Sequence, residues 1–215
     1  RMTPNGERIP LTIADTDPER GLITIVYLVV GKSSAVLESL NEGDDILDVC
    51  GPLGHATDIR KVGTVICVGG GTGIAAMHHI AKGHHLAGNR VVGIIGARSK
   101  DLLLFEKELK AFADEVLIAT DDGSYGRKGF VTTLLKERLE EDKNVAEVVA
   151  VGPVPMMAAV ADVTRPFGVK TTVSLNPIMV DGIGMCGACR VTVGGKVKFA
   201  CVDGPEFDGH QVDWD

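Results

Sequence analysis

The chain has 215 residues, of which 45% are hydrophobic, and its net charge is −7. This length and composition are enough for one to two globular domains and a small appendage, and the charge argues against nucleic acid or an anionic membrane as a partner. No apolar stretch is long enough to span a bilayer, since the longest candidate, residues 22–30, has only the length of a strand. We therefore expect a cytoplasmic protein.

The N-terminal part consists of short β-rich runs separated by Gly, Asp and Pro. Strands are expected at residues 9–14, 22–30 and 45–49, with one helical segment at 35–40. This pattern predicts part of an antiparallel barrel. Just before the helical segment, residues 31–34 read Gly-Lys-Ser-Ser, where free N–H groups and hydroxyls could receive a phosphate. A Ser at such a place is more often only the N-cap of the helix.

From Lys61 onward strands and helices alternate, which predicts a parallel α/β sheet. The expected strands are 64–68, 90–95, 115–119, 147–151 and 170–175. The expected helices between them are 74–82, 101–113, 131–141 and 155–164.

The first of these strands runs directly into a glycine loop that opens a helix. The loop contains Gly70, Gly71, Thr72 and Gly73. Between a buried strand and a helix, such a loop favours a dinucleotide pyrophosphate at the helix N-terminus. The alternative is that the glycines only allow tight packing of the strand against the helix.

Three further polar or glycine-rich loops follow later strands, at the sheet edge where ligands of open α/β sheets bind. Their candidate cofactor-binding residues are Arg98, Asp121, Asp122, Gly123, Gly152 and Pro153. Arg98 could pair with a 2′-phosphate and so indicate NADP, or it could be a solvated loop charge. The α/β part is therefore predicted to bind a nicotinamide dinucleotide.

The C-terminal segment has the spacing of an iron–sulfur site. A plant-type [2Fe–2S] loop follows C-x4-C-x2-C with a distant fourth Cys, and here Asp181, Cys186, Cys189 and Cys201 fill those places in order. Interspersed glycines let the backbone wrap closely around a cluster and direct N–H groups at its sulfurs. This pattern predicts a cluster with one carboxylate and three thiolate ligands.

A structural zinc site is the alternative for the same segment. Cys186, Cys189 and Cys201 with His210 would be a zinc-type ligand set. A disulfide is disfavoured because the chain has an odd number of cysteines, five.

These features stand in an order that resembles the ferredoxin–NADP reductase superfamily, and more closely the electron-transfer subunits of the dihydroorotate dehydrogenase B type. Within that family the chain is similar to the small (alpha) subunits of NADH-dependent reduced ferredoxin:NADP oxidoreductases. The resemblance rests on residues 7–15, the glycine loop, residues 121–126, and the tail from Asp181 to Phe207. The resemblance extends to the cluster ligands, since such subunits are similar to this chain in having one Asp and three Cys at these places.

The resemblance implies FAD on the first domain, NAD(H) across the second, and a [2Fe–2S] cluster that exchanges electrons with the flavin. The residues that it places at FAD, or near its phosphates, are Arg8, Pro10, Leu11, Thr12, Gly31, Lys32, Ser33, Ser34 and Gly51. It further implies a heterodimer with a larger flavin and iron–sulfur subunit that carries out electron bifurcation.

The expected fold is α/β, with three parts. Residues 1–60 are expected to form a partial, N-terminally truncated flavin barrel, 61–176 the nucleotide domain, and 177–215 the cluster segment. Two rival functions remain: an electron-transfer subunit serving dihydroorotate oxidation, which Asp181 in place of Cys disfavours, and a non-catalytic nucleotide-binding module with a zinc-stabilised tail.

Overall fold

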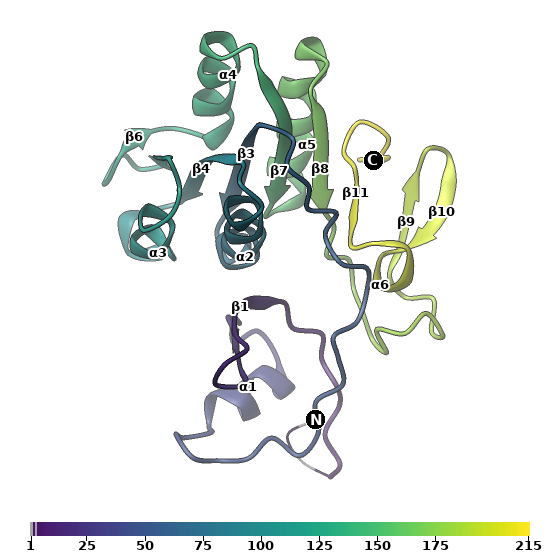
Figure 1. Ribbon diagram of the computed structural model, residues 1–215. Helices are drawn as coiled ribbons and strands as arrows, with labels where there is room; N and C mark the ends of the chain where they lie inside the picture. Colours follow the sequence, from purple (N-terminus) through teal and green to yellow (C-terminus); the bar gives the residue numbers. More distant parts are fainter. Residues whose placement is uncertain (1, 3) are drawn as a thin grey trace.

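The computed structural model describes residue 2 and residues 4–215 (Figure 1). Residues 1 and 3, which belong to the first expected domain, lie outside the described residues. In the described part of the chain, seven strands form one sheet in the order β11-β8-β7-β3-β4-β5-β6. The strands are β3 (Thr64–Gly70), β4 (Arg90–Ala97), β5 (Glu115–Thr120), β6 (Arg127–Lys128), β7 (Val145–Val151), β8 (Lys170–Ser174) and β11 (Glu206–Asp208). All neighbours are parallel except β11, which runs antiparallel to β8.

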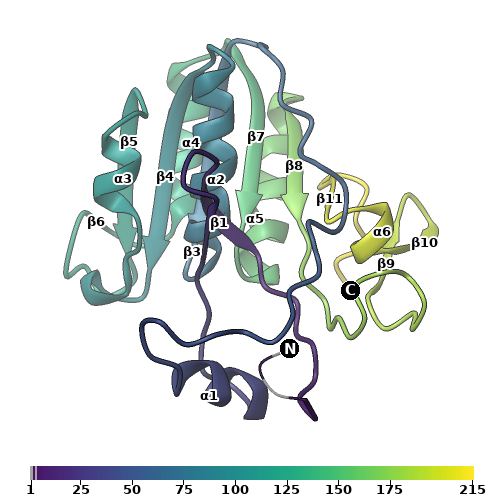
Figure 2. The same cartoon turned by 60° about the horizontal axis from the view of Figure 1, so that its bottom comes forward.

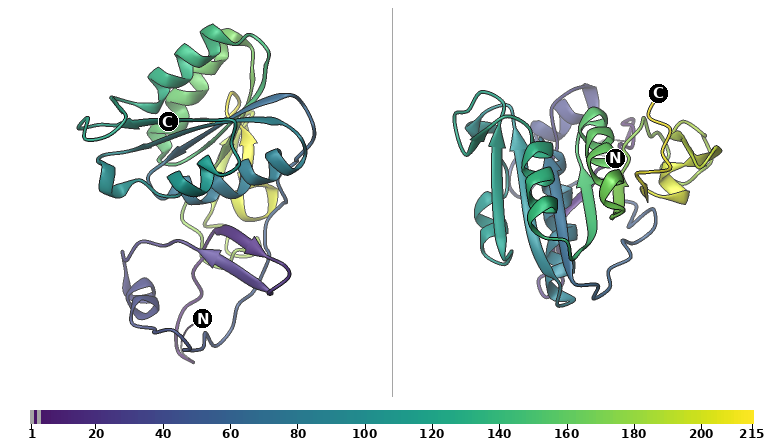
Figure 3. Two further views of the ribbon diagram at one scale, coloured as in Figure 1. Left: turned by 60° about the vertical axis from the view of Figure 1, so that its left-hand side comes forward. Right: turned by 90° about the horizontal axis from the view of Figure 1, so that it is seen from above.

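Helices cover both faces of this sheet (Figures 2 and 3). The helices α2 (Gly73–Leu86) and α3 (Glu106–Lys110) lie on one face, and α4 (Val131–Glu141) and α5 (Val154–Thr164) lie on the other. Short 3₁₀ turns, η1 (Lys100–Leu102) and η2 (Arg165–Phe167), precede α3 and follow α5. The expected alternation of strand and helix is thus confirmed. The connection from β5 to β7 crosses over β3 and β4, so the strand order reverses between β3 and β7.

Strand β3 shows why the core lies on both sides of the sheet. Val65 and Cys67 pack under α2, whereas Ile66 and Val68 pack in the cluster formed with α4 and α5. All four side chains are fully buried, as expected for the central strand of a covered parallel sheet. Burial also raises the pKa of the Cys67 thiol to about 12, so this cysteine is an inert core residue.

One expected helix is much shorter than its pattern indicated. Residues 101–113 were expected to be helical, but only α3, five residues long, is an α-helix there. The reason is local: Leu103 is extended, and Phe105 takes a left-handed conformation with φ of 55°. A helix cannot continue through either conformation.

The N-terminal region contains a two-stranded hairpin, β1 (Ile13–Asp17) with β2 (Leu22–Ile25), and the helix α1 (Lys32–Glu38). The expected strand at 9–14 begins only at Ile13, and the helix begins earlier than expected. Residues 45–49, all described, form no strand, so that expectation was wrong. A strand forms only where a neighbour pairs with it, and 45–49 have no strand partner among the described residues.

Strand β1 docks against α2, below the sheet in Figure 1. Lys82 Nζ lies 2.7 Å from Asp15 Oδ1, and His78 Nδ1 lies 3.2 Å from the carbonyl oxygen of Ala14. Partial burial would raise the pKa of Asp15, but the hydrogen bonds from Lys82 and from the Thr16 N–H, together with the Lys82 charge, hold that pKa below its usual value. The ion pair of Lys82 with Asp15 and the hydrogen bond of His78 to the backbone therefore tie the hairpin to the α/β region.

The C-terminal segment adds a second hairpin, β9 (Arg190–Val193) with β10 (Lys196–Phe199), then the four-residue helix α6 (Ala200–Asp203) and β11. Its own core is small and consists of Cys189, Ala200 and Cys201. None of the helices in the described residues has the length and apolar character needed to cross a membrane.

Replacement of a core leucine tests this packing. Leu135 of α4 is fully buried between helix and sheet. We expect Leu135→Ala to lower the free energy of unfolding by about 2–5 kcal/mol, because it leaves a cavity. Urea denaturation measures the effect, with Leu86→Ala as the control, since Leu86 is 76% exposed at the end of α2. Equal destabilisation by both variants would contradict the core described here.

Candidate nucleotide and iron–sulfur sites

The glycine loop lies where the strand order reverses, between the carboxyl ends of β3 and β7. Gly70 ends β3, Gly71 has a positive φ of 55°, and Thr72 is the N-cap of α2. The Gly71 N–H donates to the carbonyl oxygen of Gly96 on β4, at 3.0 Å. This is the position at which open α/β sheets bind ligands, and the start of α2 supplies the positive end of a helix dipole.

Three glycines lie in close packing here: Gly73 and Gly152 face backbone atoms, and Gly70 faces the Met156 side chain. A Cβ on Gly73 would collide with the Val151 carbonyl oxygen and come within 2.7 Å of Gly152 Cα. A Cβ on Gly70 would collide with the Met156 sulfur, and one on Gly152 would lie 3.1 Å from the Gly70 nitrogen. The loops after β3 and β7 therefore touch. The glycines serve tight packing and also leave the loop surface open to a phosphate, so the two readings of the motif are compatible.

The loops after β4 and β5 are joined to each other. The N–H groups of Asp121 and Asp122 donate to the carbonyl oxygens of Ala97 and Arg98, each at 3.2 Å, and the N–H of Lys100 donates to the Ser124 hydroxyl at 2.9 Å. The structure thus brings Arg98, Asp121 and Asp122 to the same edge as the glycine loop, as the sequence indicated.

Asp122 has a structural task in this edge. Its carboxylate accepts hydrogen bonds from the Ser124 hydroxyl at 2.7 Å and from the Ser124 N–H at 2.8 Å. These bonds hold the pKa of Asp122 below its usual value. The turn that they close contains Gly123, whose φ is +77°.

The residues that the resemblance places at FAD lie in the N-terminal region. Pro10 and Thr12 are exposed, with Leu11 half-buried, in an extended segment before β1. The Ser34 hydroxyl caps the start of the helix, because it accepts hydrogen bonds from the N–H groups of Val30 and Gly31, each at 3.0 Å. This bonding supports the capping role for Ser34.

The other residues of that set lie at the surface. Lys32 and Gly31 are exposed at the start of α1, and Ser33 is half-buried. Arg8 forms an ion pair with Asp48 at 3.0 Å, and Gly51 is exposed in the linker that leads to β3. The start of α1 therefore presents the Lys32 ammonium, which suits a phosphate, while the N–H groups of Val30 and Gly31 bond to Ser34.

Two of the expected cluster ligands are already together. Cys189, just before β9, and Cys201, on α6, are buried, and their sulfur atoms are 3.2 Å apart. Burial raises the pKa of the Cys201 thiol, and the hydrogen bond from Cys189 adds to this. Metal binding would displace a proton from such a thiol.

The other two expected ligands lie in an exposed loop. Asp181 accepts the N–H of Ile183 at 2.9 Å and the N–H of Cys186 at 2.5 Å. The Ile183 bond, followed by those to Cys186, keeps the pKa of Asp181 low, so its carboxylate is ionised at neutral pH. Cys186 is exposed, and its sulfur accepts the N–H of Ala188 at 3.5 Å.

The loop geometry fits a cluster. Gly182, Gly184 and Gly187 have φ values of 72°, 84° and 65°, which only glycine adopts readily. A Cβ on Gly184 would come within 3.0 Å of Val202, so the loop lies directly on the helix that carries Cys201. In the described residues no three His, Cys, Asp or Glu side chains are gathered closely enough to hold a metal ion. Cys186 and Asp181 would have to turn inward to complete the set.

His210, the fourth ligand of the alternative zinc site, has other partners in the structure. His210 Nε2 lies 2.9 Å from the Thr164 hydroxyl at the end of α5, and the Arg165 guanidinium donates to the His210 carbonyl oxygen at 3.4 Å. His210 is therefore bound to the α/β region and is not directed at the cysteines.

Sequence reasoning missed the linker residues beside the cluster loop. Leu53 contacts Gly182, since a Cβ on that glycine would lie 3.2 Å from Leu53 Cδ1, and His55 bonds to the carbonyl oxygen of Val202 at 2.6 Å. No periodicity marks an irregular linker; the only signal was a His directly after the turn at residues 51–54.

Two family models match the chain. The iron–sulfur cluster binding domain of dihydroorotate dehydrogenase B matches residues 176–213, and the oxidoreductase NAD-binding domain matches residues 67–162.

The chain is similar to two curated proteins over nearly its whole length. It is 54% identical to the dihydroorotate dehydrogenase B (NAD(+)), electron transfer subunit homolog of Thermotoga maritima, over 100% of this chain and 76% of that protein. It is 35% identical to the dihydroorotate dehydrogenase B (NAD(+)), electron transfer subunit of Fusobacterium nucleatum, over 96% of this chain and 80% of that protein.

Solved structures agree with these matches. A structure of the NADH-dependent reduced ferredoxin–NADP oxidoreductase, studied for flavin-based electron bifurcation, superposes with a TM-score of 0.91 at 52% identity, over 100% of this chain and 77% of that one. The cytochrome b5 reductase domain of Ulva prolifera nitrate reductase, at 22% identity and a TM-score of 0.58, covers 74% of this chain and 72% of that one, and shares the fold.

Substitution of Gly73 tests the glycine loop. We expect Gly73→Ala to weaken NADH binding at least tenfold, about 1.4 kcal/mol, because the new methyl group pushes the loop away from Val151. Fluorescence titration with NADH measures the affinity. Ala76→Gly, three residues further along α2, is the control: it weakens the helix by about 1 kcal/mol but leaves the loop in place. Unchanged NADH affinity in Gly73→Ala would contradict the site.

Proposed function

The chain belongs to the family of dihydroorotate dehydrogenase B electron transfer subunits, and on this basis we propose that it passes electrons between NAD(H), FAD and a [2Fe–2S] cluster within an electron-bifurcating, NADH-dependent ferredoxin:NADP oxidoreductase complex. The observation that carries the proposal is the whole-chain likeness to the bifurcating oxidoreductase structure, at 52% identity. The family models for cluster and nucleotide support the same cofactors.

We assign NAD(H) and FAD to different regions of the chain. The N–H groups at the start of α2 and the loop residues Gly70–Gly73 bind the pyrophosphate of NAD(H), and the loops after β4, β5 and β7 line its path. Pro10, Leu11 and Thr12 would hold the flavin ring, and Lys32 would pair with its phosphates. When bound, FAD exchanges a hydride with the nicotinamide and single electrons with the cluster.

The C-terminal segment holds the cluster through Asp181, Cys186, Cys189 and Cys201. In the glycine-rich loop the Ala188 N–H bonds to the Cys186 sulfur at 3.5 Å. Such a bond stabilises negative charge on a ligand sulfur, which is how a protein tunes a cluster potential. The carboxylate of Asp181 is a harder ligand than a thiolate. No acid–base side chain is needed, because the protein positions the groups between which electrons move.

Dihydroorotate oxidation with a different partner is the second candidate, because curated relatives carry that name. The Asp at position 181 favours the bifurcating assignment, because this chain resembles the small subunits of those complexes in having one Asp and three Cys as the proposed cluster ligands. Co-purification with a dihydroorotate-oxidising subunit would decide for the alternative.

The partner is a larger oxidoreductase subunit, and we propose that it docks over the cluster loop. Four exposed apolar side chains lie in the loop from Asp181 to Cys186 or just before it: Ile178, Val180, Ile183 and Met185, exposed between 49% and 82%. Exposed apolar groups beside a redox centre are typical of a protein interface. All five cysteines are described and free, which supports a cytoplasmic location for the complex.

The first experiment measures iron, acid-labile sulfide and flavin in anaerobically purified protein, with its visible spectrum before and after NADH. We expect two irons and two sulfides per chain, and bleaching of the visible bands by NADH. Zinc without sulfide would overturn the electron-transfer function.

Substitution of Asp181 tests the ligand assignment. We expect Asp181→Ala to lower iron retention at least tenfold, because even partners of metal ligands cost 10–100-fold when removed. Asp181→Cys should retain the cluster with a changed visible and EPR spectrum. Asp162→Ala is the control, since Asp162 is an exposed carboxylate on α5, outside the cluster segment. Full iron content in Asp181→Ala would remove Asp181 from the ligand set.

Substitution of Met185 tests the docking face. Met185 is 82% exposed, and we expect Met185→Glu to weaken association with the larger subunit about tenfold, because a charge would be buried at the interface. The matched control is Leu86→Glu, on an apolar residue of 76% exposure at the far end of α2. Affinity measured by surface plasmon resonance should change only for Met185→Glu; equal affinities would place the interface elsewhere.

A further inference from the structure

The short helix α6 cannot satisfy its own carbonyl groups. The last four carbonyls of a helix have no partner within it, and α6 has only four residues, Ala200–Asp203. Two carbonyl oxygens at its end are instead bonded by one residue of the linker. His55 Nε2 lies 2.6 Å from the Val202 oxygen, and the His55 N–H donates to the Gly204 oxygen at 2.9 Å. Since a carbonyl only accepts, Nε2 carries the proton in this bond.

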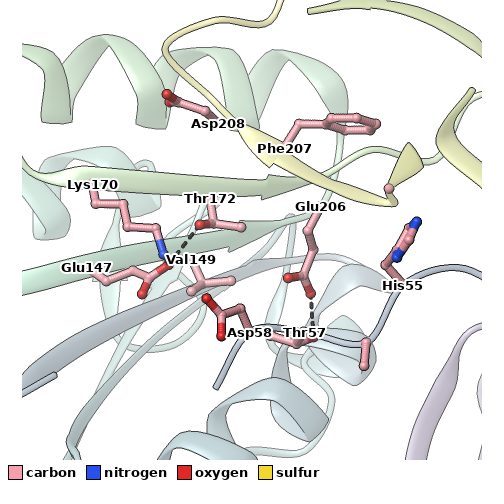
Figure 4. Close-up of a pocket in the computed structure, with 12 residues that line it drawn as sticks. His55, Thr57, Asp58, Glu147, Val149, Lys170, Thr172, Glu206, Phe207 and Asp208 are labelled. Atoms are coloured by element: carbon pink, nitrogen blue, oxygen red, sulfur yellow. Dashed lines mark hydrogen bonds and ion pairs between the residues drawn. The ribbon is translucent and has the colours of Figure 1, made fainter. Parts of the chain in front are cut away.

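The same linker touches the cluster loop on its other side. Leu53 lies against Gly182, next to Asp181, and a Cβ on Gly54 would lie 3.3 Å from the Gly204 oxygen. Two residues after His55, the Thr57 hydroxyl donates to Glu206 at 2.6 Å. Figure 4 shows His55 and Thr57 on the linker facing the segment that contains Glu206 and Phe207. The linker, residues 53–57, therefore contacts the cluster segment near both ends of the ligand set.

Val202 connects the linker contacts with the proposed cluster ligands. It follows Cys201 directly, and its methyl groups lie 3.0 and 3.1 Å from the Cβ position of Gly184 in the glycine-rich loop. A displacement of Val202 would therefore move Cys201 and the loop that bears Cys186 relative to each other. The contact that fixes the Val202 backbone from outside is the hydrogen bond from His55.

We propose that His55 is a positioning residue of the iron–sulfur site, which holds the Cys201 turn in place through its Nε2–H bond to the Val202 carbonyl. The inference rests on the cluster function proposed above. It assigns to an exposed linker residue, outside the ligand motif, a part in retaining the cluster and in setting its environment.

The test compares two substitutions that separate the hydrogen bond from the bulk of the ring. His55→Phe keeps an aromatic ring but has no donor, and His55→Gln keeps an N–H donor but has no ring. Each full-length variant is purified anaerobically, and the release of iron to bathophenanthroline and the EPR spectrum of the reduced cluster are measured. His85→Phe is the matched control, since His85 is an exposed histidine of α2.

We expect His55→Phe to release iron about tenfold faster or more and to shift the EPR signal, while His55→Gln and His85→Phe stay close to the wild type. Wild-type rates and spectra in His55→Phe would overturn the inference and leave the proposed function intact. If both His55 variants lose iron equally, ring packing and not the bond holds the turn, which also overturns it. Wild-type protein without iron and sulfide would overturn the function and, with it, this inference.

Discussion

The close approach of two backbone segments, at the carboxyl ends of β3 and β7, determines where the glycine loop and the start of α2 lie. Gly73 faces the carbonyl oxygen of Val151, and Gly152 faces the backbone of Gly70, so no side chain fits between the segments. This contact fixes the start of α2 relative to the sheet. The positive end of that helix and the open loop beside it, which suit a pyrophosphate, are consequences of the same packing.

The cluster segment follows a different rule, because it is too small to fold on apolar burial alone. Its core is Cys189, Ala200 and Cys201, so two of its three core residues are also proposed metal ligands. In such a segment the free energy of metal binding is folding free energy. The linker from the N-terminal region adds hydrogen bonds that the segment cannot make internally, which joins the cluster to the part of the chain proposed to hold the flavin.

The sequence predicted the α/β region well because its signals are local. A short buried apolar run such as 64–68, between segments with helical patterns, is typical of a strand, and the structure has β3 there. The expected helix 131–141 was confirmed with the same bounds. The N-terminal strands were predicted poorly, since 45–49 is β-prone but has no strand to pair with in the part of the chain that the structure describes. The ligand spacing of the tail was visible in the sequence. The contribution of His55 was not, because it depends on a contact between residues 147 positions apart.

The edges of the sheet give the cluster segment a second role. At one edge, β6 is only two residues long, both charged, Arg127 and Lys128, which discourages pairing with another molecule. At the other edge β8 would present an open row of backbone groups, and β11 of the cluster segment covers it in antiparallel register. The segment that carries the proposed cluster ligands thus also shields an edge of the nucleotide-binding sheet from pairing with another molecule.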